Sequence, residues 1–169
     1  SYEIKLKSYL NKKNFDNTLT TEEELNMLKK LFKKKEVNTE LTAPLTGKLL
    51  PLEQVPDQVF SQKMMGDGIA IEPSDNNVVS PIDGEVVDVF KTKHAISFRT
   101  DGGAEILVHM GLETVQLDGK GFDIHVENGQ KVKKGDRLAT FDIDTIAADG
   151  YKTVTPIILL NGEEFAITN

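Results

Sequence analysis

The sequence predicts an all-β fold, either an antiparallel β-sandwich or a partly closed barrel of about ten short strands. Glycine and proline are frequent, at 13 and 6 of 169 residues. They separate runs of strand length that are rich in valine and isoleucine, whereas long helical patterns are few. This mixture favours a fold held together by pairing between short strands.

Composition excludes several classes of protein. The chain has no cysteine, so neither disulfides nor a cysteine-based metal site can form. The longest apolar runs fall far short of the ~20 residues that a membrane helix needs, and no signal peptide is visible. We therefore expect a cytoplasmic location. Because the first residue is Ser1 and not methionine, we expect the chain to be a fragment of something longer.

Charge divides the chain into two parts, which we take as an N-terminal extension at 1–40 and a β-sandwich domain at 41–169. The extension holds 9 lysines and 7 acidic residues, a net charge of +2, whereas the domain holds 11 basic and 20 acidic residues, a net charge of −9. An acidic body disfavours nucleic acid as a ligand, because phosphate backbones require a basic surface. It suits partners that dock through a positive patch.

One short helix is predicted in the extension. Thr20 or Thr21 can cap its start, and leucines recur at helical spacing from Leu25 onward. Lysines at its far end complement the helix dipole. The segment is interpreted as a surface helix, or alternatively as a tether to a membrane permease with its lysines near the anionic leaflet.

The domain opens with two similar units, which suggest a sheet built from related halves. Residues 43–50 and 80–87 share the order small, proline, apolar, polar, glycine, charged, apolar, apolar, with an offset of 37 residues. Between them, Met65–Ile71 is a glycine-rich turn that leads into a buried strand. No helix and no Lys-Ser/Thr pair follow it, so nucleotide binding is disfavoured. Further on, Asp144–Ala148 predicts a single helical turn, and Thr153–Leu160 and Glu164–Thr168 predict strands.

A hairpin organises the centre of the domain. Its strands are Ala95–Phe98 and Ala104–Val108, and Asp101-Gly102 between them is a strong turn signal. A two-residue loop at this dipeptide pairs Thr100 with Gly103.

The same register places His94 directly opposite His109, as cross-strand neighbours on one face of the sheet. A three-residue loop with a bulge would shift the pairing by one residue. Either way, two of the three histidines in the chain come from adjacent strands.

A histidine pair suits proton transfer, metal binding or covalent catalysis. A hydrolase triad needs a nearby nucleophile, and alternation along the strand is expected to point Ser97 away from His94. Zinc needs a third ligand, and neither Glu113 nor His125 stands at a recognisable metal spacing. No metal and no cofactor are therefore predicted.

Phosphoryl transfer onto an imidazole nitrogen has fewer requirements. One ring must be held in the correct tautomer and aimed at the donor phosphorus, while neighbouring donors stabilise the charged oxygens. His109 is the predicted nucleophile and His94 the predicted donor to the phosphoryl oxygens. The hydroxyl of Thr92, two residues before His94, can orient a ring.

These residues resemble the glucose-family enzyme IIA domain of the phosphoenolpyruvate-dependent sugar phosphotransferase system. The resemblance runs from about Leu41 to Asn161 and leaves the extension outside. It is carried by these motifs: Val55–Phe60, Met65–Gly68, Ser80–Gly84, Thr92–Ala95, Ile106–Val115, Leu117–Phe122 and Thr155-Pro156.

The resemblance implies a phosphohistidine relay on an antiparallel β-sandwich. His109 would accept the phosphoryl group from the carrier protein HPr and pass it to an enzyme IIB domain, which phosphorylates incoming sugar. His94 would stabilise the phosphorylated ring, and Thr92 would take part in the hydrogen-bond network. A parent permease would bring the domain close to a membrane.

A docking face around the histidines is also implied, because apolar rings that exclude water fit a partner's apolar patch. Two of its predicted members depart from the family pattern: Met110 follows the active histidine, and Glu113 replaces an aspartate, which bears on partner preference. The other predicted members are Asp57, Val59, Phe60 and Phe90.

Two alternatives stay open. The domain could be regulatory, fused to or binding a sugar symporter outside the phosphotransferase system and controlling transport through its phosphorylation state. Turns at 80–84 and 132–136 also echo biotinyl and lipoyl carrier domains, although the lysine at a hairpin tip that such carriers modify is not evident.

Overall fold

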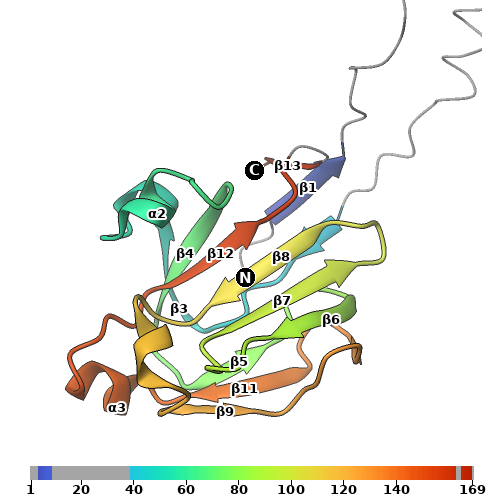
Figure 1. Cartoon of the computed structure of the whole chain (residues 1–169). Helices are drawn as coiled ribbons and strands as arrows, with labels where there is room; N and C mark the ends of the chain where they lie inside the picture. The colour runs from blue at the N-terminus through green and yellow to red at the C-terminus, as the bar shows by residue number, and fades with distance from the viewer. Residues whose placement is uncertain (1–3, 9–38, 163–164, 169) are drawn as a thin grey trace, which may run out of the picture.

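The computed structural model of the protein describes residues 4–8, 39–162 and 165–168 (Figure 1). Every paired strand in this part of the chain is antiparallel, which confirms the predicted all-β class. The strands are β1 Ile4–Ser8, β2 Thr39–Leu41, β3 Gly47–Pro51, β4 Gly68–Pro73, β5 Asn77–Val79, β6 Gly84–Val89, β7 Ala95–Thr100, β8 Glu105–His109, β9 Phe122–Ile124, β10 Lys131–Val132, β11 Arg137–Phe141, β12 Thr155–Leu159 and β13 Phe165–Thr168.

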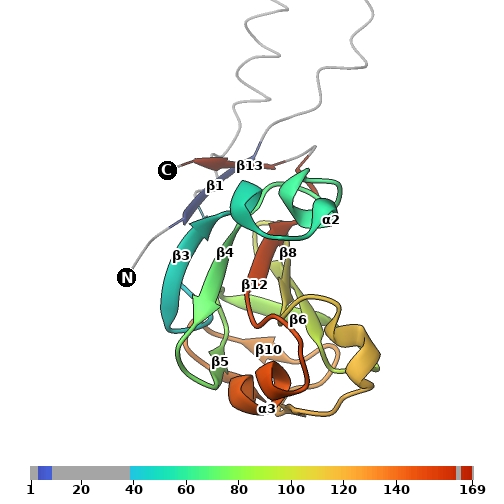
Figure 2. The same ribbon diagram turned by 90° about the vertical axis from the view of Figure 1, so that its left-hand side faces the viewer.

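Three sheets contain these strands. The largest has seven strands in the order β10-β6-β7-β8-β12-β4-β3, and the other two have the orders β5-β11-β9 and β13-β1-β2. Short helical segments connect them: η1 Leu52–Gln54, α2 Gln58–Ser61, η2 Thr114–Leu117 and α3 Ile143–Ala148. Both views place the segment that carries α2 at the opposite end of the domain from α3 (Figures 1 and 2).

Part of the predicted extension forms a strand. β1 pairs with β2 and with β13, so Ile4–Ser8 lies in a sheet beside the last strand of the chain. The predicted helix after Thr20 lies outside the described residues. The domain boundary at residue 40 stays a prediction.

The seven-stranded sheet buries apolar side chains on both faces. Ile96, Phe98 and Val108 belong to the larger core cluster, which also includes side chains of β9 and β11. The residues that alternate with them, such as Ala95 and Leu107, belong to a smaller cluster. The segment from η1 to α2 covers that second face with these buried side chains: Leu52, Val55 and Phe60.

The two repeated units each deliver a strand that begins at their glycine. β3 starts at Gly47 and β6 starts at Gly84. A β-carbon at Gly47 would overlap the carbonyl oxygen of Glu72, and one at Gly84 would overlap that of Arg99, each on the neighbouring strand. Close approach of two backbones therefore explains why both units carry glycine at this position.

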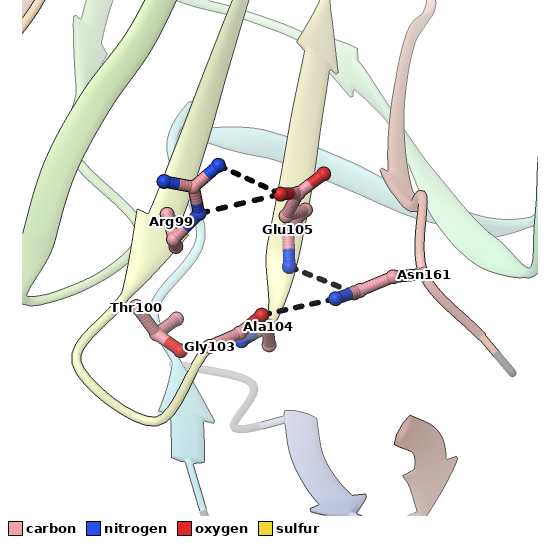
Figure 3. Close-up of polar contacts among 6 residues, drawn as sticks. All are labelled: Arg99, Thr100, Gly103, Ala104, Glu105 and Asn161. Atoms are coloured by element: carbon pink, nitrogen blue, oxygen red, sulfur yellow. Dashed lines mark hydrogen bonds and ion pairs between the residues drawn. The ribbon is translucent and has the colours of Figure 1, made fainter. Parts of the chain in front are cut away.

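The β7–β8 hairpin closes through a three-residue loop, not the predicted two-residue loop (Figure 3). The amide of Gly103 donates to the Thr100 carbonyl, and the amide of Thr100 donates to the Ala104 carbonyl, both at 2.9 Å. Gly103 has a φ of +94°, as a bulge after a tight turn requires. The register therefore shifts by one, as the alternative loop predicts.

The predicted elements of the C-terminal third are present with small shifts in their ends. α3 begins one residue earlier than expected, and the carboxylate of Asp142 caps it by accepting from the Thr145 amide at 3.2 Å. The predicted strands at 153–160 and 164–168 are β12 and β13.

Candidate functional site

The two histidines meet, although their strands do not pair them. The register places Ala95, not His94, opposite His109. The rings nevertheless lie 4.8 Å apart between centroids, with an angle of 78° between their planes. The predicted juxtaposition is therefore present, but the predicted register that led to it was wrong.

An irregular turn before β7 brings the His94 ring to this position. Lys93 has a φ of +59°, and its amide donates to the Phe90 carbonyl at 2.7 Å. The amide of Met110 donates to the His94 carbonyl at 2.8 Å, so His94 stays hydrogen-bonded to the chain just after His109. His94 precedes the regular strand, and strict alternation of faces does not apply to it.

A hydrogen bond to the backbone fixes the tautomer of His109. Its Nδ1 lies 2.7 Å from the carbonyl oxygen of Gly111. A carbonyl oxygen can only accept, so Nδ1 carries the proton and donates. In the neutral ring the lone pair is then on Nε2, which is the nitrogen able to attack phosphorus.

Thr92 orients the second ring, as expected. Its Oγ1 lies 2.7 Å from Nδ1 of His94. When this hydroxyl donates to Nδ1, the proton of the neutral His94 ring is on Nε2. The second histidine can then donate a hydrogen bond, while the first offers a lone pair.

Burial keeps both rings neutral. Only 5% of His94 is exposed, and burial, followed by repulsion from the charge on His109, lowers the pKa of His94 from 6.5 to about 4. Burial also lowers the pKa of His109, while the Gly111 carbonyl and the Asp57 carboxylate oppose the shift. Neutral imidazoles at physiological pH suit a nucleophile and a hydrogen-bond donor.

Aromatic side chains surround the pair. The Phe60 ring lies 4.9 Å from the His109 ring, and the Phe90 ring lies 5.5 Å from the His94 ring in an edge-on arrangement. Phe60 is buried, whereas Phe90 and Val59 are 37% and 41% exposed. Part of the predicted docking face is thus accessible beside the histidines.

Asp57 holds the helix that carries Phe60. Its carboxylate accepts from the amides of Val59 and Phe60, at 2.8 Å and 3.4 Å, and so caps the N-terminus of α2. The same carboxylate raises the pKa of His109, against the effect of burial. Asp57 therefore holds in place the helix that carries Phe60, and it partly offsets the effect of burial on the pKa of His109.

The assignment of Met110 to the docking face was wrong. Met110 is 0% exposed and packs in the larger core cluster, because it follows His109 on the strand and points to the other face of the sheet. Glu113 is exposed and has a φ of +56° before η2. It can therefore reach a partner.

The expectation that Ser97 points away from His94 assumed strict alternation along one strand, and His94 lies before β7 begins. Ser97 pairs with Leu107, and it shares the face of Ala95 and His109. It is buried, and its cross-strand neighbour lies two residues before His109.

The third histidine lies elsewhere. Nε2 of His125, at the end of β9, is 3.4 Å from Thr140 Oγ1 and 3.8 Å from the Asp123 carboxylate. Within residues 4–8, 39–162 and 165–168, no three His, Asp or Glu side chains are grouped so that they could hold a metal ion. The same part of the chain contains no helix long and apolar enough to cross a membrane.

Sequence reasoning missed the Gly111 carbonyl as a functional group. It is a backbone atom, and the only signal for it was the glycine two residues after the reactive histidine.

Comparison with known proteins places the chain in a family. Residues 39–165 match the family model described as phosphoenolpyruvate-dependent sugar phosphotransferase system, EIIA 1.

Curated relatives and a solved structure agree with the family model. The chain is 52% identical over 138 residues to a PTS system glucose-specific EIIA component of Oceanobacillus iheyensis, covering 80% of this chain and 84% of the relative. It is 51% identical over 137 residues to the component of the same name in Bacillus cereus, covering 80% and 83%. Glucose permease IIA from Mycoplasma capricolum has 43% identity and a TM-score of 0.69, covering 72% of this chain and 79% of that structure. The chain therefore belongs to the EIIA 1 family of the phosphoenolpyruvate-dependent sugar phosphotransferase system, and it relays a phosphoryl group from HPr to enzyme IIB.

Proposed function

We propose that Nε2 of His109 is the atom that carries the phosphoryl group. The observation behind this proposal is the 2.7 Å hydrogen bond from Nδ1 of His109 to the Gly111 carbonyl. Nε2 attacks the phosphorus of phosphohistidine in HPr, an N–P bond forms at Nε2, and the N–P bond to the HPr imidazole breaks. The electron pair of the broken bond leaves with the HPr ring.

His94 stabilises the transferred group. With Nδ1 accepting from Thr92, its Nε2–H donates to a phosphoryl oxygen as negative charge spreads over the three oxygens. The low pKa of His94 in the unphosphorylated protein keeps this ring neutral, so it meets the incoming phosphoryl group as a hydrogen-bond donor.

The docking face consists of Val59 and Phe90 as its exposed apolar members and Glu113 as its exposed charge. Phe60 supports the face from beneath, against the His109 ring. HPr and enzyme IIB bind this one face in turn, because each must bring its reactive atom to the same imidazole. The sugar is glucose, as in the names of the relatives, and the relay operates on the cytoplasmic side of the membrane.

Phosphorylation by phosphoenolpyruvate, enzyme I and HPr tests the assignment. The wild-type chain is expected to gain one acid-labile phosphoryl group, and His109→Ala is expected to gain none. His94→Gln is expected to accept the group and to donate it slowly to the IIB domain of a glucose permease. His125→Ala, which removes the histidine outside the site, is the matched control and should behave as wild type. Labelling that persists in His109→Ala would overturn the proposal.

A further inference from the structure

The carbonyl that fixes the His109 ring depends on an unusual backbone conformation. Gly111 has a φ of +80°, a value that L-residues with side chains rarely adopt. A β-carbon there would lie 2.6 Å from Cγ2 of Thr114 and 2.8 Å from the Lys152 carbonyl oxygen. The direction of the Gly111 carbonyl is therefore set by the turn from Met110 to Thr114 and by what packs against it.

Hydrogen bonds hold the peptide groups on both sides of Gly111. The amide of Leu112 donates to the Lys152 carbonyl at 3.0 Å. That amide shares a peptide plane with the Gly111 carbonyl, so the plane is held at one end by Lys152 and at the other by His109. The preceding peptide plane ends in the Met110 carbonyl, which accepts from Oγ1 of Thr114 at 2.6 Å.

Within this network, the hydrogen bond from Thr114 is the one that comes from a side chain other than the two histidines. Thr114 is 0% exposed, so water does not compete for its hydroxyl. The amide of Met110, in the peptide group before the one that Thr114 holds, donates to the His94 carbonyl at 2.8 Å. The hydroxyl therefore restrains the turn at a point linked to both histidines.

We infer that Thr114 is a positioning residue for phosphoryl transfer, whose hydroxyl holds the 110–114 turn so that the Gly111 carbonyl keeps the lone pair of His109 on Nε2. The inference rests on the proposed role of His109. When the hydroxyl is removed, the Met110 carbonyl loses its partner and the turn relaxes. The tautomer with a proton on Nε2 then becomes populated, and in it Nε2 has no lone pair with which to attack.

Thr114→Val tests this inference, because valine keeps the shape of threonine and removes the hydroxyl. Thr114→Ser restores the hydroxyl without the methyl group. Thr100→Val is the matched control: this buried threonine accepts from the Ala104 amide at 3.0 Å, at the other end of the same hairpin. Nitrogen-15 NMR of the imidazole reports the tautomer of His109, and rapid-quench kinetics report transfer from phospho-HPr.

We expect a mixed His109 tautomer in Thr114→Val and a transfer rate lowered by about tenfold or more, since small misplacements of reacting groups are costly. Thr114→Ser and Thr100→Val should keep the wild-type tautomer and rate. If Thr114→Val does not fold, Thr114→Cys, whose thiol is a weak donor, replaces it with the same expected direction.

Two results would overturn the inference. The first is a single wild-type tautomer and an unchanged rate in the variant that lacks the hydroxyl. The second is an equal loss of rate in Thr100→Val, which would mean that general loosening of the hairpin is responsible. Failure of wild-type His109 to become labelled would instead refute the proposed function, so the two failures are distinguishable.

Discussion

The β7–β8 hairpin has a closed end, at the loop between Thr100 and Ala104, and an open end, at His94 and His109. The two ends belong to one strand pair but differ in burial and in the contacts that they make. At the closed end, polar groups near the surface make the contacts: Arg99 and Glu105 form an ion pair at 2.9 Å, with both side chains partly exposed. At the open end, the buried imidazole of His94 and the half-buried imidazole of His109, both with lowered pKa values, lie side by side among aromatic rings. The closed end sets the register, and the open end supplies the chemistry.

A side-chain amide holds the closed end, whereas irregular backbone conformations shape the open end. Asn161 clamps the closed end, because it accepts from the Glu105 amide and donates to the Gly103 carbonyl, both at 2.9 Å (Figure 3). The open end leaves the regular ladder at Lys93 and at Gly111, both of which have positive φ. Departure from strand geometry is what lets the rings meet.

The largest contrast is expected between two glycines with positive φ. Gly111→Ala should lower the free energy of unfolding by about 3 kcal/mol and slow phosphoryl transfer, because the new β-carbon meets both Thr114 and Lys152. Gly103→Ala should cost about 1 kcal/mol and leave transfer unchanged, since its β-carbon would meet only the Phe165 ring, at 3.7 Å. Denaturant unfolding and transfer kinetics measure both. Equal transfer rates in the two variants would contradict the contrast.

The open end should also make stability depend on pH. The folded pKa of His94 is about 4, below its unfolded value of 6.5, so the unfolded chain binds more protons between these values. Stability is therefore lost as the pH falls through this window, by on the order of 3 kcal/mol.

His94→Gln isolates this contribution from the titration of carboxylates. Its unfolding free energy should fall less steeply with acidification than that of wild type, and the two curves should diverge from pH 6.5 down to about 4. Denaturant titrations across this range measure the difference. Parallel curves would show that His94 is not buried as a neutral ring.

The smallest effect is expected at the closed end. Asn161→Ala removes two hydrogen bonds and should lower the free energy of unfolding by about 1–2 kcal/mol. The rate of transfer from phospho-HPr should not change, because the register of the paired strands survives. A clear loss of rate in this variant would mean that the two ends are coupled more tightly than the geometry indicates.

Sequence patterns predicted the strands of the hairpin well, since apolar residues recur at strand length on both sides of an Asp-Gly turn. They did not predict the register, because a run such as Asp101-Gly102-Gly103 fits both a two-residue and a three-residue loop. The choice depends on Gly103 adopting a φ of +94°, and the Asn161 clamp that accompanies this loop comes from a distant part of the chain.

The sequence predicted which side chains meet in the site, but it did not predict the backbone groups that hold them. His109, His94 and Thr92 come together, whereas the inward position of Met110 follows from alternation next to an outward His109 and could have been predicted. The positive φ of Lys93 could not be predicted, because lysine is not a residue type that favours this conformation. Backbone groups that hold the rings depend on tertiary packing, and a single sequence does not show it.

The position of the phosphoryl group on the phosphorylated protein tests the central claim most directly. Phosphorus–nitrogen couplings in the NMR spectrum distinguish Nε2 from Nδ1 and identify the histidine. We predict phosphorus on Nε2 of His109, with Nδ1 still protonated toward the Gly111 carbonyl. Phosphorus on Nδ1 of His109, or on His94, would contradict the account.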